Sequence, residues 1–264
     1  MTDESAILVE ARGPIEILTL NRPDALNALN AALVSDLIAY FSSLHDRPEV
    51  RVVLMRGAGR AFCAGVDLKA PRSAEARVHT TLKRQKSYGR IVRLMRSCPQ
   101  PIIGLGHGAA CGGGFSFLLA CDIRYAAPSL RMNAAYIKIG LTGCDVASSY
   151  LLPRLVGLSV AAEFLMTGRF ITAERAKAVN LVSEVVDEDR LLDTGLAMAQ
   201  DMLLTSPLGL RLTKDALNFS IDAPSLEAAM ALEDRQQVLI SFTEDYAEAR
   251  TAFGEKRPPT YHDR

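Results

Sequence analysis

The sequence contains no tryptophan, only four histidines and no pair of cysteines at C-x-x-C spacing. The histidines are scattered and none belongs to an H-E-x-x-H pattern, so neither common kind of zinc site is expected. The cysteines are odd in number and spread over a long chain, which favours reduced thiols over a disulfide framework. They are Cys63, Cys98, Cys111, Cys121 and Cys144. No metal is therefore predicted.

An excess of charge and a long unbroken hydrophobic run are also missing. The 30 basic and 30 acidic residues give a net charge of zero, which argues against a broad surface for nucleic acid or acidic lipid. Residues Met1–Ser5 are polar and acidic, unlike a secretory leader. The apolar stretch Pro101–Ala120 is interrupted by glycines and His107, unlike a membrane span. These absences predict a cytoplasmic protein without nucleic-acid or membrane partners.

The order of hydrophobic patterns predicts an α/β fold. Of the 264 residues, 49% are hydrophobic, enough for one sizeable core. Strands and helices alternate up to about residue 195, which favours a parallel sheet with crossovers, and the pattern beyond is helical. The chain is therefore divided into a core, 1–195, and a helical region, 196–264. The predicted strands are Ile7–Glu10 and Ile15–Leu20 (a hairpin), Val50–Met55, Pro101–Gly106 and, less regular, Leu181–Val186. The predicted helices are Pro23–Leu44, His79–Cys98, Ser149–Leu155, Val160–Met166, Thr172–Val179, Asp187–Leu204, Pro207–Phe219 and Pro224–Gly254.

Three consecutive glycines, Gly112–Gly114, stand where the strand Pro101–Gly106 gives way to an apolar helix. Glycine destabilises regular structure, so three together require a reason. One is close approach of a ligand to the free N–H groups at a helix start, where a developing oxyanion is stabilised. The alternative is tight packing of the helix on the strand.

A second accessible stretch of backbone follows the strand Val50–Met55. Residues Cys63, Ala64 and Gly65 are small and precede Asp67 in an A-G-x-D pattern. This pattern alone is weak. Paired with the three glycines it becomes informative, because an oxyanion hole takes its N–H donors from separate segments.

These segments resemble the crotonase (enoyl-CoA hydratase/isomerase) family over nearly the whole chain. Leu20–Leu29 (LNRPDALNAL) is similar to the family's N-terminal signature, Ala61–Leu68 (AFCAGVDL) to its first oxyanion loop and Gly108–Gly114 (GAACGGG) to its second. Later matches are Leu165–Arg169, Ala176–Ala178, Leu181–Val182 and Phe253–Pro258. The resemblance implies a ββα spiral core, a helical C-terminal trimerisation region and acyl-CoA thioester ligands.

The resemblance also implies site residues. By motif position, the backbone N–H groups of Val66 and Gly113 would hold the thioester carbonyl and stabilise an enolate or oxyanion. The Ala64 carbonyl would lie near the adenine or pantetheine of CoA. Basic side chains would approach the CoA phosphates, unless they are ordinary solvated surface charges: Arg22, Lys69 and, across a subunit boundary, Lys256. CoA enters as part of the substrate, no separate cofactor is implied, and a homotrimer or a dimer of trimers is expected.

The sequence departs from its family at two positions. There the hydratases carry the glutamates that orient a water molecule, take its proton and return a proton to the substrate. Counting from Gly114 puts Ser116 at the first position, and counting back from Gly140 puts Tyr136 at the second. A serine is a poor base without a histidine or lysine beside it, and a tyrosine is a better donor than base at neutral pH. Alternatively, Ser116 is merely a small helix residue and Tyr136 packs an acyl pocket. Conventional two-carboxylate hydration is not supported.

One acidic residue remains near the expected pocket, Asp145. Some relatives, the dienoyl-CoA isomerases and aryl-CoA dehalogenases, carry a working aspartate in this loop, although theirs aligns one position earlier, with Cys144. Asp145 is thus a candidate base or nucleophile, and the alternative is a cap for the helix that contains Ser148 and Ser149. Cys144 is more simply an inert thiol.

Three functions stay open on the sequence. The first is an enoyl-CoA hydratase or isomerase with an altered catalytic set. The second is other thioester chemistry through Asp145: a double-bond shift, hydrolysis or dehalogenation. The third is an acyl-CoA binder that has kept both loops and lost catalysis.

Overall fold

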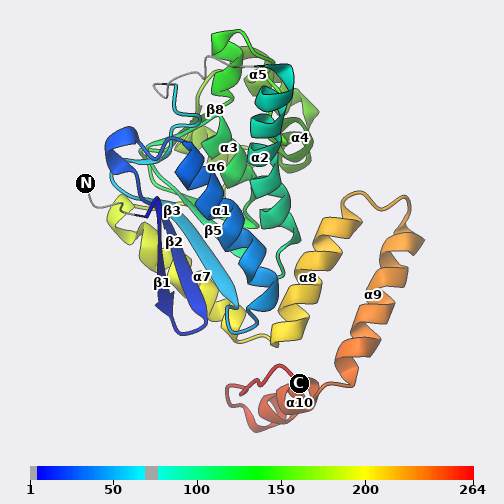
Figure 1. The fold of residues 1–264 in the computed structure, drawn as a ribbon. Helices are drawn as coiled ribbons and strands as arrows, with labels where there is room; N and C mark the ends of the chain where they lie inside the picture. Colours follow the sequence, from blue (N-terminus) through cyan, green and yellow to red (C-terminus); the bar gives the residue numbers. More distant parts are fainter. Residues whose placement is uncertain (1–4, 69–76) are drawn as a thin grey trace.

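The computed structural model describes residues 5–68 and 77–264, and in them the predicted α/β architecture is confirmed (Figure 1). A larger sheet has the strand order β1-β2-β3-β5-β7-β10, and a smaller one has the order β4-β6-β8-β9. The strands β1 and β2 form the expected antiparallel hairpin, and from β2 onward the larger sheet is parallel. The larger sheet consists of β1 (Ile7–Arg12), β2 (Ile15–Leu20), β3 (Val52–Gly57), β5 (Ile102–Gly106), β7 (Ile123–Ala126) and β10 (Glu184–Val185). The smaller consists of β4 (Ala61–Cys63), β6 (Ala109–Cys111), β8 (Arg131–Asn133) and β9 (Ile171–Thr172).

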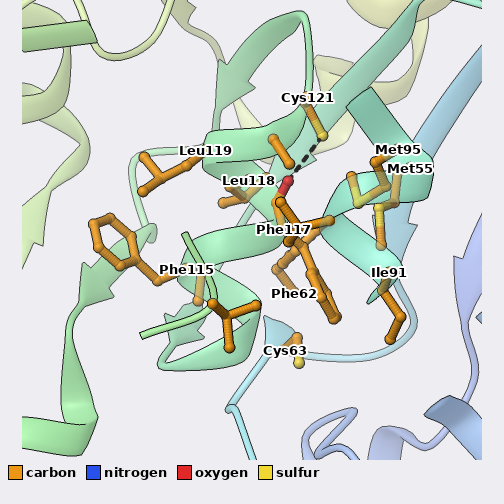
Figure 2. Close-up of a cluster of buried hydrophobic side chains, with 14 of the residues drawn as sticks. Met55, Phe62, Cys63, Ile91, Met95, Phe115, Phe117, Leu118, Leu119 and Cys121 are labelled. Carbon is orange, nitrogen blue, oxygen red and sulfur yellow. Dashed lines mark hydrogen bonds between the residues drawn. The ribbon is translucent and has the colours of Figure 1, made fainter. Parts of the chain in front are cut away.

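The strands β2 and β3 are buried on both faces, as expected of a parallel sheet covered by helices. Alternate side chains pack into two separate clusters. Val52 and Leu54 of β3 lie with Leu191 and Ala199 of α7 (Leu191–Leu203) in one cluster. Val53 and Met55 lie in the other, larger cluster with residues of α1 (Ala31–Ser43), α2 (Val78–Ser97) and α3 (Gly113–Ala120). Figure 2 shows part of the larger cluster, where Phe62 and Phe117 lie beside Met55, Ile91 and Met95.

The predicted helix Pro23–Leu44 is wrong at its start. A single turn, η1 (Pro23–Ala25), is followed by Leu26 and Asn27 with left-handed φ angles of 51° and 55°, and α1 begins only at Ala31. The cause is the buried Asn27 side chain, whose Nδ2 donates to the carbonyls of Ala58 at 2.9 Å and Ala61 at 2.8 Å. These hydrogen bonds tie the chain to the loop before β4 and prevent the helix from starting earlier.

The helical region also differs from expectation. The predicted segment Pro224–Gly254 is two helices: Phe242 is the C-cap of the first, and Thr243 caps the second by accepting a hydrogen bond from the Tyr246 N–H at 3.1 Å. The expected boundary at residue 195 falls inside α7, where Gly195 packs closely on Leu54 and Leu105. The helices beyond α3 are α4 (Ser148–Val156), α5 (Leu158–Thr167), α6 (Ala173–Ala178), α7, α8 (Pro207–Ser220), α9 (Leu226–Ser241) and α10 (Glu244–Glu255), with short turns η2 (Leu44–Asp46), η3 (Ala135–Ile139) and η4 (Glu188–Arg190).

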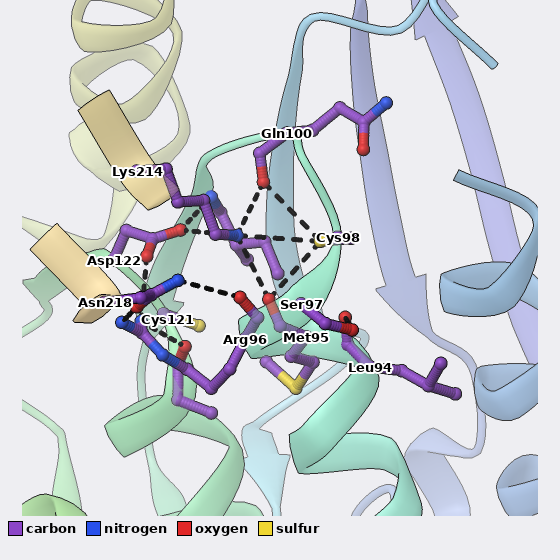
Figure 3. Close-up of polar contacts among 12 residues, drawn as sticks. Leu94, Met95, Arg96, Ser97, Cys98, Gln100, Cys121, Asp122, Lys214 and Asn218 are labelled. Atoms are coloured by element: carbon purple, nitrogen blue, oxygen red, sulfur yellow. Dashed lines mark hydrogen bonds and ion pairs between the residues drawn. The ribbon is translucent and has the colours of Figure 1, made fainter. Parts of the chain in front are cut away.

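The helices α8, α9 and α10 extend away from the core, and α8 is fastened to it by one buried lysine (Figures 1 and 3). Lys214 is buried, and its ammonium group lies 3.0 Å from the carboxylate of Asp122. It also donates to the carbonyls of Met95 at 3.0 Å and Gln100 at 2.8 Å. Each acceptor would cost about 1–3 kcal/mol if left unpaired, so this cluster fixes the direction in which α8 leaves the core.

Two glycines bring the smaller sheet and the start of α3 into direct contact. The strands β4 and β6 pair in parallel, which sets the segments that follow them side by side. A Cβ atom on Gly114 would lie 2.2 Å from the Cys63 carbonyl oxygen, and one on Gly65 would lie 2.8 Å from the Cys111 carbonyl oxygen. No larger residue fits at Gly114 without separating the two segments.

Gly114→Ala is therefore expected to destabilise the protein, by about 1–3 kcal/mol or more, because backbone must move to admit the methyl group. Gly89→Ala is the matched control. Gly89 lies inside α2, where an added Cβ would meet only the Arg93 side chain at 3.5 Å. Gly89→Ala should stabilise the protein by about 0.5–1 kcal/mol, because alanine is favoured over glycine inside a helix. Urea midpoints at equal protein concentration test both, and a Gly114→Ala variant as stable as the parent chain would contradict the close contact.

Candidate active site

The first loop of the site runs from Cys63 to Asp67 after β4 and presents a free backbone N–H at Val66. Leu29 brackets this residue, because its N–H donates to the Gly65 carbonyl at 2.7 Å and its carbonyl accepts from the Asp67 N–H at 3.1 Å. The Val66 N–H between them has no hydrogen-bond partner within the described residues. The residue is 43% exposed, so a ligand can reach its backbone.

The second segment is the start of α3. Gly112 has a φ of 52°, a conformation that favours glycine, and its N–H donates to the Asn133 carbonyl at 2.9 Å. Gly113 is the first residue of α3, and its N–H is likewise unpartnered in the part of the chain that the structure describes. Free N–H groups at a helix start lie at the positive end of the helix dipole. The structure thus brings the two segments named by the sequence into contact, and the amides of Val66 and Gly113 both lack a partner among the described residues.

Three buried hydroxyl groups converge beside this junction. The Tyr136 hydroxyl donates to the Ser148 Oγ at 2.6 Å, and the Ser116 Oγ lies 3.4 Å from the Asp145 carbonyl oxygen. Ser116 and Ser148 are fully buried, and Tyr136 is buried on η3. The Tyr136 ring also lies next to the glycines, because a Cβ on Gly112 would come within 3.7 Å of it. We call Ser116, Tyr136 and Ser148 the hydroxyl cluster.

The hydroxyl cluster is uncharged at neutral pH. Burial raises the pKa of Tyr136 to about 12, and the hydrogen bonds with Ser148 and Ser116 only partly oppose this. A phenol with this pKa donates hydrogen bonds but does not take up protons as a base. Ser116 and Tyr136, the two positions expected to replace the hydratase glutamates, therefore lie together and carry no acid–base pair.

Asp145 follows η3 in the loop before α4 and presents its backbone to the hydroxyl cluster. Its carboxylate accepts hydrogen bonds from the Val146 N–H at 2.7 Å and from Gln85 Nε2 of α2 at 2.5 Å. Burial raises the pKa of this carboxyl group, although both hydrogen bonds work in the opposite direction. The expectation that Asp145 caps the next helix is wrong, because Ala147 is the N-cap residue of α4 and Asp145 bonds to its own neighbour instead.

The residues expected at the CoA phosphates are spread over the chain. The Arg22 guanidinium lies 3.2 Å from the Asp67 carboxylate and also donates to the Ala28 carbonyl, so it braces the first loop. The Ala64 N–H donates to the Leu26 carbonyl at 3.0 Å. Lys69 lies outside the described residues. Lys256 is exposed at the end of α10, remote from the two loops of its own chain (Figure 1).

An apolar cavity of about 250 Å³ adjoins the Asp145 loop, between η3, α4 and α5. Its walls include Ile137, Cys144 and Ser149, the sequence neighbours of the polar residues Tyr136, Asp145 and Ser148. The polar residues Tyr136, Asp145 and Ser148 thus contact one another, while the residues next to them in sequence line the apolar cavity.

Two hydrogen-bond partners in this site were not predicted from the sequence. Ser148 joins Tyr136 from 12 positions away, and Gln85 reaches Asp145 across 60 positions. Neither belongs to a motif, and both stand among other polar residues of their helices, so the sequence does not mark them. Within residues 5–68 and 77–264, no set of three or more histidine, cysteine, aspartate or glutamate side chains is grouped as a metal site would require. No helix in these ranges has both the length and the apolar character needed to cross a membrane.

Comparison with known proteins identifies the family. The sequence model described as enoyl-CoA hydratase/isomerase matches residues 10–264. A protein of Mycobacterium bovis named probable enoyl-CoA hydratase is 37% identical, over 98% of this chain and 93% of its own. The 1,2-epoxyphenylacetyl-CoA isomerase of Escherichia coli is 32% identical, over 97% of each chain. A crystal structure of the enoyl-CoA hydratase from Bacillus anthracis superposes with a TM-score of 0.93 at 31% identity, over 98% of this chain and all of the other.

Relatives of both reaction types thus cover almost the whole chain, and the fold matches along its length. The chain belongs to the enoyl-CoA hydratase/isomerase (crotonase) family of enzymes.

Proposed function

We propose that the protein is an acyl-CoA isomerase that shifts a double bond by moving one proton, and that it is a poor hydratase. The observation that carries this proposal is the composition of the hydroxyl cluster. Where two carboxylates would activate water, Ser116 and Tyr136 are neutral and hydrogen-bonded, Tyr136 to Ser148. The carboxylate on the adjoining loop belongs to Asp145, and its raised pKa suits a general base.

The proposed reaction begins at the two free amides. The N–H groups of Val66 and Gly113 donate to the thioester carbonyl oxygen, whose negative charge grows as a proton leaves the neighbouring carbon. The Asp145 carboxylate takes that proton, and the electron pair of the broken C–H bond forms a dienolate. Asp145 then returns the proton two carbons further along, which regenerates the carbonyl and leaves the double bond conjugated with it. No water is consumed.

The hydroxyl cluster favours isomerisation over hydration because it offers no base that could activate water. Its donors and acceptors are largely used within the cluster and by the Asp145 carbonyl, so no base is available there to activate water. Slow hydration of crotonyl-CoA follows from this arrangement.

Replacing Val66 by proline removes one proposed oxyanion donor and is expected to lower kcat about 10²–10³-fold. The preceding glycine tolerates the backbone restriction that proline imposes. Val66→Ala keeps the N–H and serves as the control, with near-parental activity. The measurement is the appearance of 2-enoyl-CoA absorbance from a 3-enoyl-CoA. Equal rates for the proline and alanine variants would contradict the role of this amide.

Asp145→Asn removes the proposed base without changing its shape and should lower isomerisation at least about 100-fold. The parent enzyme should lose activity as the pH falls, because the carboxylate protonates at a pKa above its ordinary value. The variant should show no such acidic limb in its pH profile. Asp222→Asn, which alters a carboxylate on the surface, is the control. Unchanged isomerisation by Asp145→Asn would overturn the proposed reaction.

We further propose that the protein assembles as a homotrimer or a dimer of trimers, and that it is cytoplasmic, in keeping with its free cysteines. The exposed surface of α8, α9 and α10 supports the assembly. These helices extend away from the core and leave large apolar side chains exposed, which a neighbouring subunit would cover. These include Leu217, Leu226, Val238, Phe242 and Phe253. In such an assembly Lys256 would reach the CoA phosphates of a neighbouring subunit, while Arg22, Ala64 and Lys69 contact CoA within their own.

Sedimentation is expected to give three or six times the chain mass of 28.6 kDa. Lys256→Ala should raise KM several-fold for an acyl-CoA but leave it unchanged for the acyl-pantetheine thioester, which lacks the phosphates. Lys83→Ala, an exposed lysine of α2, is the control. A monomeric parent protein, or equal KM changes for both thioesters, would contradict the assignment.

A further inference from the structure

The loop that carries Asp145 is strained immediately after this residue. Val146 and Ala147 have left-handed φ angles of 45° and 65°. This region is unfavourable for residues other than glycine, and a β-branched residue such as Val146 is a particular outlier there. Strain of this kind persists only where surrounding contacts hold it. Val146 is buried in the larger cluster, which supplies one such contact.

Ser148 supplies further contacts that hold the strained turn. Its N–H donates to the Asp145 carbonyl at 2.9 Å, and its Oγ accepts from the Asp145 N–H at 3.1 Å. These reciprocal hydrogen bonds close the turn over the two strained residues. The side chain is fully buried, so water cannot replace its hydroxyl.

The same hydroxyl reaches the rest of the site. It accepts the hydrogen bond from the Tyr136 hydroxyl at 2.6 Å, and the Tyr136 ring lies against Gly112 at the start of α3. Ser148 therefore connects the strained turn to the segment that carries the Gly113 amide. The Ser148 hydroxyl does not cap α4, because the N-cap residue is Ala147, which makes no side-chain capping hydrogen bond.

We propose that Ser148 is a positioning residue, whose buried hydroxyl holds the strained Asp145–Ser148 turn and so fixes the Asp145 carboxylate relative to the two oxyanion amides. This inference rests on the proposed function, in which Asp145 moves the proton. A small displacement of a catalytic group is enough to lower a rate strongly, so the hydroxyl should matter for kcat far more than for binding.

The test compares Ser148→Ala with Ser148→Thr, which keeps the hydroxyl, and with Thr142→Ala, which removes an exposed hydroxyl from the same loop. Isomerisation of a 3-enoyl-CoA gives kcat and KM, and thermal midpoints report folding. Ser148→Ala is expected to lose roughly 10- to 100-fold in kcat with little change in KM. Ser148→Thr and Thr142→Ala should stay close to the parent enzyme.

A second variant separates positioning from stability. Ala147→Gly relieves the left-handed strain, so Ser148→Ala/Ala147→Gly should recover the parent thermal midpoint while kcat stays low. Recovery of kcat together with stability would show that Ser148 is only structural and overturn the proposal. Parental kcat in Ser148→Ala would do the same.

The combination with Asp145→Asn keeps this inference distinct from the proposed function. If Ser148 acts through Asp145, adding Ser148→Ala to Asp145→Asn should lower the residual rate no further, whereas independent effects would multiply and overturn the proposal. An active Asp145→Asn variant overturns the proposed function itself. An inactive Asp145→Asn beside a fully active Ser148→Ala overturns the positioning role alone.

Discussion

The approach of Gly114 to the Cys63 carbonyl is the constraint on which the candidate site depends. A Cβ atom there would lie 2.2 Å from that oxygen, so only glycine lets α3 begin against the end of β4. Parallel pairing of β4 with β6 sets the same two segments in register. This backbone contact places the loop that carries Val66 beside the start of α3, where Gly113 lies. A site built from main-chain groups persists through side-chain changes, which is why it can support more than one reaction.

Side chains around the amides then decide the chemistry. In this chain Ser116, Tyr136 and Ser148 form a buried neutral group, and burial keeps the Tyr136 phenol protonated. Asp145 differs, because its carboxylate is half-buried and hydrogen-bonded to Gln85, and burial raises its pKa. In the proposed reaction the hydroxyl cluster takes no part in proton transfer, and the Asp145 carboxylate moves the proton. This contrast of environments is what points away from hydration and towards a proton shift.

Local patterns predicted much of this fold, and long-range contacts account for what they missed. The hairpin, the buried strands and both glycine segments follow from alternation, apolar runs and glycine content. The late start of α1 does not, because Asn27 is held by Ala58 and Ala61, more than 30 residues away. The same contrast between local patterns and long-range contacts applies to the site. The positions of Ser116 and Tyr136 follow from motif spacing, whereas Ser148 and Gln85 become partners only through folding, and the strain at Val146 has no signature in the sequence.

The central claim is that this enzyme forms an enolate by proton abstraction and does not add water. Nuclear magnetic resonance of a 3-enoyl-CoA in D2O with the parent enzyme tests it most directly, because the deuterium positions and the products are read together. The account predicts 2-enoyl-CoA and almost no 3-hydroxyacyl-CoA, with deuterium at the carbon that Asp145 protonates to the extent that the proton on Asp145 exchanges with solvent first. Rapid accumulation of 3-hydroxyacyl-CoA, from this substrate or from crotonyl-CoA, would contradict it.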